Sequence, residues 1–179
     1  MANVTWNEIL DAIAELMAGA HDELTDRVFT RQRFIEAADD VDELVRLLQS
    51  LNSDGKPQGI VLDWLGSSSI RGAGFSIIQT EQFQGAFLLP YDDKRSDDQT
   101  STQVFRDVTA ALRTTFNARA NHELGLGSSV QSLFLQLPET SSGPIRNNSG
   151  EDAVQVHARP LRIAVQVIID SCLEAEIIE

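Results

Sequence analysis

The stretch VQVHARPLRIAVQVIID, residues 154–170, decides how this sequence folds. Its apolar residues fall at 154, 156 and 158, change phase beside Pro160, and continue at 161, 163, 165, 167 and 169. Such an alternation is typical of a β-strand with one buried face. About 15 residues at roughly 3.3 Å each would span roughly 50 Å, whereas strands usually hold about 5 to 6 residues. The stretch therefore predicts an unusually long strand.

The phase change beside Pro160 suggests what this strand is for. Proline lacks the amide donor that a central strand needs, so it sits at sheet edges or bulges, and a bulge inserts the one residue that shifts the phase. We therefore expect the first half of the strand to leave its own sheet and offer a backbone edge to another chain. The alternative is a loop up to Pro160, followed by an ordinary strand from Leu161. The residues expected at an interface are Val154, Val156, His157, Arg159 and Pro160, together with Asp92, Asp93, Lys94, Arg95, Asp97 and Asp98 of a charged loop.

Three segments carry helical patterns. Thr5 and Glu8 form a T-x-x-E capping box at the start of the first, and apolar residues at 9, 13, 16, 17, 20 and 24 make one stripe. The second helix follows the acids at 39 and 40 and places leucines 44, 47, 48 and 51 on one face. The third runs from about residue 101 to about residue 120, with a capping box at Thr100 and Gln103.

The strand-like runs are 27–35, 59–65, 70–80, 82–90 and 130–137, besides the final strand. Short connections between the middle three favour an antiparallel meander. The sequence thus predicts an α+β fold: a mostly antiparallel sheet with helices packed on one face, in the order α-β-α-β-β-β-α-β-β. We expect a single domain over residues 1–179, with a charged loop at 91–100 and a mobile polar loop at 138–153.

The composition excludes several classes of protein. The 27 acidic residues outnumber the 14 basic ones, for a net charge of −13, so the surface repels nucleic-acid phosphates and DNA can pass close by without being gripped. Cys172, the single cysteine, can form no internal disulfide. No run approaches the roughly 18 apolar residues of a membrane span, and no signal peptide is evident. We expect a soluble protein that folds in a reducing cytoplasm.

The usual patterns of catalytic and metal sites are missing. The histidines at 21, 122 and 157 lie in three different predicted elements and show no metal-ligand spacing. There is no G-x-S-x-G elbow, GLGSS at 125–129 lacks the ending of a phosphate loop, and DDKRSDD at 92–98 lacks the spacing of a calcium loop. We predict no catalytic residue, no metal site and no cofactor.

The order of the elements resembles that of the tail terminator (tail completion) proteins of long-tailed bacteriophages. The segments that carry the resemblance are WNEILDAIAELM (6–17), FQGAFLLPYDD (83–93), VFRDVTAALRTTF (104–116), VQSLFLQL (130–137) and VHARPLRIAVQVII (156–169). The resemblance implies a structural virion protein of the tail-neck region, assembled in the host cytoplasm as a homo-oligomeric ring, commonly a hexamer. Such a ring caps the head-proximal end of the tail tube, contacts the tube protein and a head–tail connector, and lets DNA pass through its lumen.

Two features depart from that family, and two other classes stay open. The extra helix around 41–51 and the long loop before the last strand leave open a related neck or head–tail joining protein. A second class is an acidic binding module that inhibits a nucleic-acid-binding partner, but here the acids are spread along the whole chain. A third is a small enzyme, which would require a deep pocket with convergent titratable groups.

Overall fold

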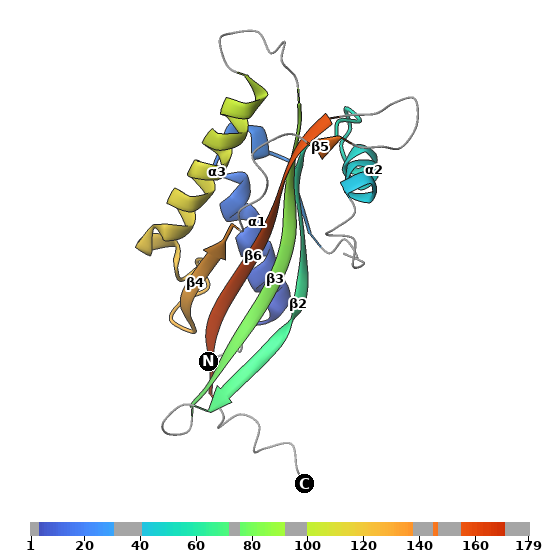
Figure 1. The fold of residues 1–179 in the computed structure, drawn as a ribbon. Helices are drawn as coiled ribbons and strands as arrows, with labels where there is room; N and C mark the ends of the chain where they lie inside the picture. Colours follow the sequence, from blue (N-terminus) through green and yellow to red (C-terminus); the bar gives the residue numbers. More distant parts are fainter. Residues whose placement is uncertain are drawn as a thin grey trace.

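The computed structural model describes residues 4–30, 41–71, 76–91, 100–137, 145–146 and 155–170. The helices are α1 (Trp6–Ala18), α2 (Val41–Leu51) and α3 (Ser101–Asn117), with 3-10 turns η1 (Asp22–Leu24) and η3 (Arg119–Asn121). The strands are β1 (Val28–Thr30), β2 (Gly59–Arg71), β3 (Ser76–Pro90), β4 (Val130–Gln136), β5 (Ile145–Arg146) and β6 (Gln155–Asp170). The predicted α+β class is confirmed (Figure 1).

The strands form one mixed, mostly antiparallel sheet. Its order is β1-β2-β3-β6-β4, β5 pairs with β6, and the β1–β2 pair is the parallel one. β6 is 16 residues long, so the predicted long strand is confirmed. It pairs with β3 from Val156 opposite Pro90 to Asp170 opposite Ser76. The expectation that its first half leaves the sheet is therefore wrong, and so is the alternative of a strand that starts only at Leu161.

Pro160 does not mark a bulge against β3, because it pairs with Ala86 in unbroken register. The phase change has another cause. Val156 packs with α2 in a cluster on one face of the sheet, whereas Leu161 and Ile163 pack with α1 and α3 on the other face. The strand keeps its regular alternation, and what changes along it is which face lies under a helix.

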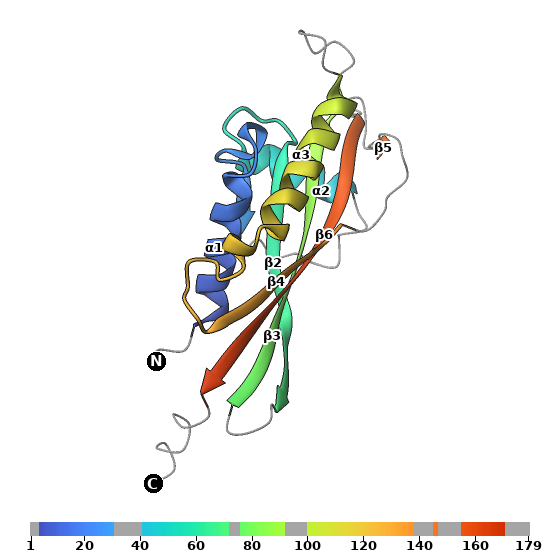
Figure 2. The same ribbon diagram turned by 90° about the vertical axis from the view of Figure 1, so that its left-hand side faces the viewer.

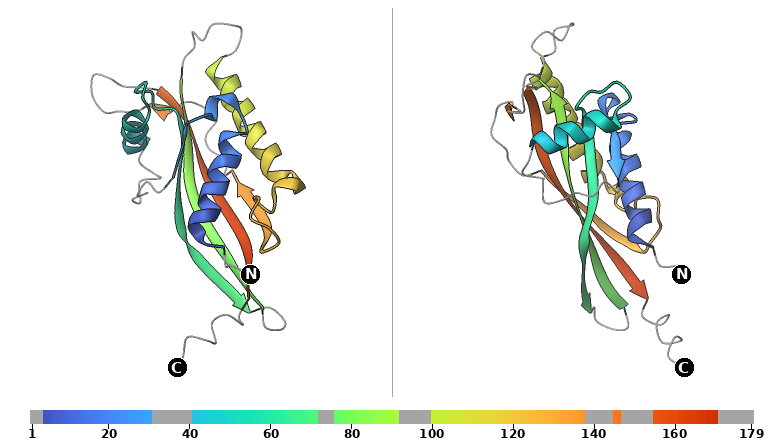
Figure 3. Two further views of the ribbon diagram at one scale, coloured as in Figure 1. Left: turned by 180° about the vertical axis from the view of Figure 1, so that it is seen from behind. Right: turned by 90° about the vertical axis from the view of Figure 1, so that its right-hand side faces the viewer.

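The helices divide between the two faces. As expected, α1 and α3 share one face of the sheet, but α2 lies on the opposite face (Figures 1 and 3). Leu44 and Leu48 of α2 pack against Val61 and Leu88 there. Where α2 covers the sheet, both of its faces are buried. This explains the continuous apolar runs IVL at 60–62 and AFLL at 86–89.

Two long strands replace the three predicted between residues 59 and 90. The segment GSSS continues β2, with a register shift between Trp64 and Gly66 that leaves Leu65 as a bulge residue. β3 is continuous through the buried Glu81, whose carboxylate accepts hydrogen bonds from Trp64 Nε1 (2.6 Å) and Gln79 Nε2. These bonds offset the cost of removing the carboxylate from water. Glycine and serine, as in GSSS at 66–69, are compatible with extended backbone. The composition of this segment therefore suggested a break between two strands where β2 in fact continues.

The helix starts follow their capping signals. At α1 the full capping box forms: the Glu8 carboxylate accepts from Thr5 N at 2.7 Å, and Thr5 Oγ1 accepts from Glu8 N at 3.3 Å. At α3 the Thr100 side chain caps Gln103 N, but the Gln103 amide donates to Asp107 instead of returning to the cap. Helix α3 ends at Asn117, before the predicted end near Ala120.

Beyond the helices, the sheet continues. β2, β3 and β6 run together past the ends of α1 and α3 to the far end of the molecule (Figure 2).

Within the described residues, no helix combines the length and the apolar character needed to cross a bilayer.

Candidate interaction surfaces

Of the residues predicted at an interface, the four that the structure describes do not gather on one exposed surface. Residues 92–98 and Val154 lie outside the described part of the chain, as does most of the expected loop at 138–153. Val156 is fully buried and His157 is 5% exposed, while Arg159 and Pro160 are half-buried. The structure therefore places Val156 and His157 in the core of the subunit and not on its surface.

His157 is held by aromatic contacts on the α3 side of the sheet. Its ring stacks on Phe105 at 5.0 Å between centroids, meets Tyr91 edge-on at 5.4 Å, and lies 3.5 Å from the hydroxyl of Ser101. Burial lowers the pKa of His157, because the imidazolium form would lose hydration there. This geometry joins the start of α3 to β6 and is that of a core histidine.

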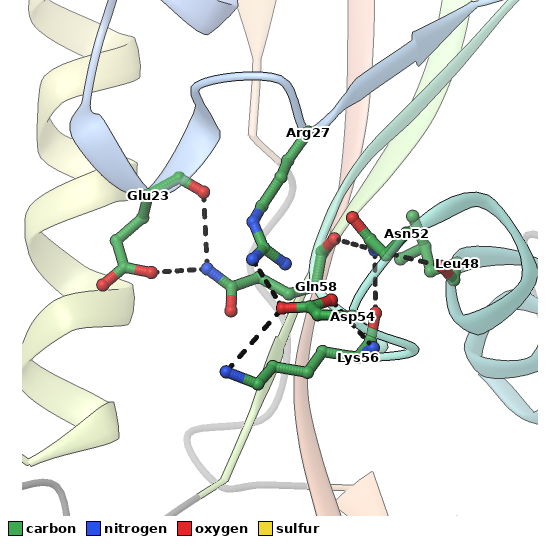
Figure 4. Close-up of polar contacts among 7 residues, drawn as sticks. All are labelled: Glu23, Arg27, Leu48, Asn52, Asp54, Lys56 and Gln58. Carbon is green, nitrogen blue, oxygen red and sulfur yellow. Dashed lines mark hydrogen bonds and ion pairs between the residues drawn. The ribbon is translucent and has the colours of Figure 1, made fainter.

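The most extensive polar network described joins η1, α2 and β2 (Figure 4). The buried Asn52 amide donates to the carbonyl oxygens of Leu48, Lys56 and Gln58 at 2.7–3.0 Å. The Gln58 amide in turn donates to Glu23. These bonds anchor the end of α2 beside the start of β2, so they hold the helix on the second face of the sheet.

Arg27 and Asp54 close the network. Arg27 Nη2 lies 2.8 Å from Asp54 Oδ2, and this hydrogen bond lowers the pKa of Asp54. The Arg27 carbonyl also accepts from Ile60 N at 2.8 Å, where β1 joins β2. With Asp54 ion-paired and the amides hydrogen-bonded, the cluster ties elements together.

The first candidate surface is the open sheet face, made of Leu65, Gln82, Phe134, Gln136, Arg162 and Ala164. It lies on the α2 side of the sheet, toward the protruding end, and these residues line a shallow groove of about 240 Å³. No described helix covers it. Leu65 is 53% exposed and Phe134 54% exposed. Large apolar side chains that lie together on an exposed surface commonly mark an interaction site.

An exposed strand edge borders this face. β1 pairs only with residues 60–62 of β2, so residues 65–71 have no strand beside them on that side among the described residues. At the opposite edge of the sheet lies β4. Backbone donors and acceptors along such edges are a template for another strand. The sequence placed an open edge on the first half of β6, and residues 157–161 do lack a described strand on the side away from β3, between the pairings with β5 and β4; the edges of β2 and β4 were not predicted.

The second candidate surface is the arginine groove, made of Arg106, Arg113 and Arg159 with Phe105, Thr109, Ala110 and Thr114. It lies between α3 and β6, and its volume is about 480 Å³. Arg159 lies over the Phe105 ring at 5.7 Å, and Arg106 and Arg113 are exposed on α3. No acid lines it, in a chain whose net charge is −13.

Neither groove holds the groups that acid–base chemistry needs. Their linings contain no His, Cys, Asp or Glu. In the described part of the chain, no three such residues are placed to hold a metal ion. What both surfaces offer is shape, apolar area and positive charge, which comes from Arg162 in the open sheet face and from three arginines in the arginine groove.

The sequence contained signals for both surfaces. In LFL at 133–135 the middle apolar residue breaks the alternation of β4, and it is Phe134 that lies on the open sheet face. Arg106 and Arg113 are seven residues apart, which puts them on one stripe of a helix. Leu65 gave no such signal, because its exposure depends on the bulge beside Gly66.

Comparison with known proteins does not indicate a function for this chain. The sequence matches no protein-family model and no curated protein. The function is therefore argued from the surfaces themselves and from the order of the elements.

Proposed function

We propose that this chain is a tail terminator of a long-tailed bacteriophage: a structural protein that forms a homo-oligomeric ring on the head-proximal end of the tail tube. The observation that carries the proposal is the open sheet face beside an exposed strand edge. A sheet face that bears Leu65 and Phe134 and lies under no described helix is stabilised by covering it.

The charge of the chain supports the same role. Arg162 is the one charged side chain in the lining of the open sheet face, so a neighbour can dock there with little electrostatic repulsion. The rest of the molecule carries a large negative excess, which prevents DNA from adhering as it passes. A capping ring needs both properties: contacts to protein and none that hold DNA.

The tube protein and a head–tail connector are the proposed partners, and the ring is proposed to be a hexamer. The contact surface proposed here differs from the one expected from the sequence. It comprises the open sheet face and the outer edge of β2, and not the first half of β6.

Electron microscopy of purified virions tests this function. With antibody fragments bound to this chain, we expect labels in the tail-neck region, and tails assembled without the chain should grow to irregular lengths. Labels elsewhere on the virion, or tails of normal length without the chain, would reject the role. Labels in the neck together with normal tail length would instead support a head–tail joining protein.

A further inference from the structure

The acidic counterpart of the arginine groove lies on α1. Glu8, Asp11 and Glu15 are all exposed there, on the face opposite the buried Ile9 and Ile13. Offsets of three and four residues place the three carboxylates on one stripe of the helix, the acidic face of α1.

The two stripes match in spacing. Glu8 and Glu15 are seven residues apart on α1, and Arg106 and Arg113 are seven residues apart on α3. At about 1.5 Å per residue, each pair spans roughly 10.5 Å along its helix. Small side chains, Thr109 and Ala110, lie between the arginines in the groove, so a second helix can approach closely.

The acidic face and the arginine groove lie on different flanks of one molecule. α1 contacts β1 and β2, whereas the groove lies between α3 and β6. In the sheet, β3 lies between β2 and β6 and so separates the two sides. Figure 2 shows α1 on one side of α3 and the first part of β6 on the other. The two surfaces are therefore placed to join different neighbours. Surfaces of this kind join copies head to tail, and such a contact forms a ring when the rotation closes.

We propose that the arginine groove of one copy receives the acidic face of α1 from a second copy. This inference rests on the proposed function in assuming self-assembly, and adds the contact that joins neighbours. Arginine favours it, since a guanidinium binds a carboxylate through two parallel hydrogen bonds. A nucleic acid fits less well, because its phosphates would continue beyond the groove along a chain that holds 27 acids against 14 bases.

Charge reversal on each side tests the contact. One variant carries Arg106→Glu and Arg113→Glu, and the other carries Asp11→Lys and Glu15→Lys; Glu8 is kept because it caps α1. Each variant alone should self-associate at least about tenfold more weakly than the wild type in sedimentation equilibrium, since like charges then face each other. The control, Arg46→Glu with Arg119→Glu, changes the net charge as much as the groove variant at exposed sites outside the groove.

Mixing the two variants is the decisive step. Each reversed surface then meets its complement on the other variant, so assembly should return with the two variants in equal amounts. A single chain that carries all four substitutions should also self-associate. Circular dichroism checks that every variant is folded, and restoration on mixing is itself evidence of folded partners.

Three results would overturn the inference: wild-type protein that stays monomeric at all concentrations, reversals that leave self-association unchanged, or a mixture that fails to assemble. Binding of a labelled DNA duplex that is lost in the groove variant would overturn it as well, in favour of a phosphate ligand. None of these decides whether the chain caps the tail tube, which depends on its location in the virion.

Discussion

Single residues carry two features that the fold depends on: a buried histidine and a glycine at a close approach. His157 is surrounded by Phe105, Tyr91 and Ser101, where burial lowers its pKa. Gly85 lies where β3 passes β2, and an added Cβ would lie 2.3 Å from the Val61 carbonyl oxygen. For each residue, the expected effect on stability follows from the atoms around it and not from its residue type.

His157 should make stability depend on pH. Burial holds its pKa in the folded state below the ordinary value of a histidine, so the unfolded chain takes up a proton first as pH falls. The stabilisation is complete above the unfolded pKa and is lost as pH falls toward the folded pKa. Urea midpoints should therefore drop between about pH 7.5 and about pH 5.5. The variant His157→Phe should show a weaker dependence, and an identical slope in both proteins would contradict the assignment.

Substitution of Gly85 by alanine should destabilise the sheet by about 1 to 3 kcal/mol, as overpacking in a core does. The matched control is Gly19→Ala at the end of α1, where the nearest atom to the added Cβ would be 3.5 Å away. Denaturant unfolding of both variants checks this. Equal stability of the two would mean that β2 and β3 do not approach so closely.

At the scale of elements, the position of α2 distinguishes this fold from a sheet with helices on one face. The helix buries Leu44, Val45 and Leu48 against the second face, and the Asn52 network anchors its end. Its leucine spacing predicted the helix and its buried side, because that information is local. Which face of the sheet it covers was not predictable, since it depends on contacts with residues far along the chain.

Truncation of Leu48 to alanine should cost about 2 to 5 kcal/mol, because the side chain is fully buried and leaves a cavity. The exposed Gln103, at the start of α3, is the control: its change to alanine should alter the free energy of unfolding by less than about 0.5 kcal/mol. Thermal and urea unfolding give both values. A small effect at Leu48 would show that α2 is loosely attached to the sheet.

On the scale of the whole molecule, the sheet is longer than the helical layers that cover it. The open sheet face follows from that mismatch, and so does the row of strand edge on β2. Both are properties of an assembled sheet, because they depend on how β2, β3, β6 and β4 align.

Replacement of Leu65 and Phe134 by serine should separate folding from assembly. Both side chains are more than half exposed, so the free energy of unfolding should change by less than about 1 kcal/mol. Incorporation into tails should fall sharply, as measured by the amount of the chain in purified virions. The control replaces the exposed Ser53 and Asn117 by alanine, since both lie outside the open sheet face and outside β2. Normal incorporation of the double serine variant would remove the open sheet face from the proposed interface.

The sequence by itself determined the local features: the long alternating β6, the capped start of α1, the α+β class and the apolar side of each helix. These depend on periods of 2 and 3.6 residues and on caps, which act within a few positions. The tertiary structure decided which face of β6 is covered along its length, that β2 and β4 carry open edges, and that α2, alone of the described helices, lies on the second face. Such choices depend on pairing between residues far apart in the chain, so no local pattern can encode them.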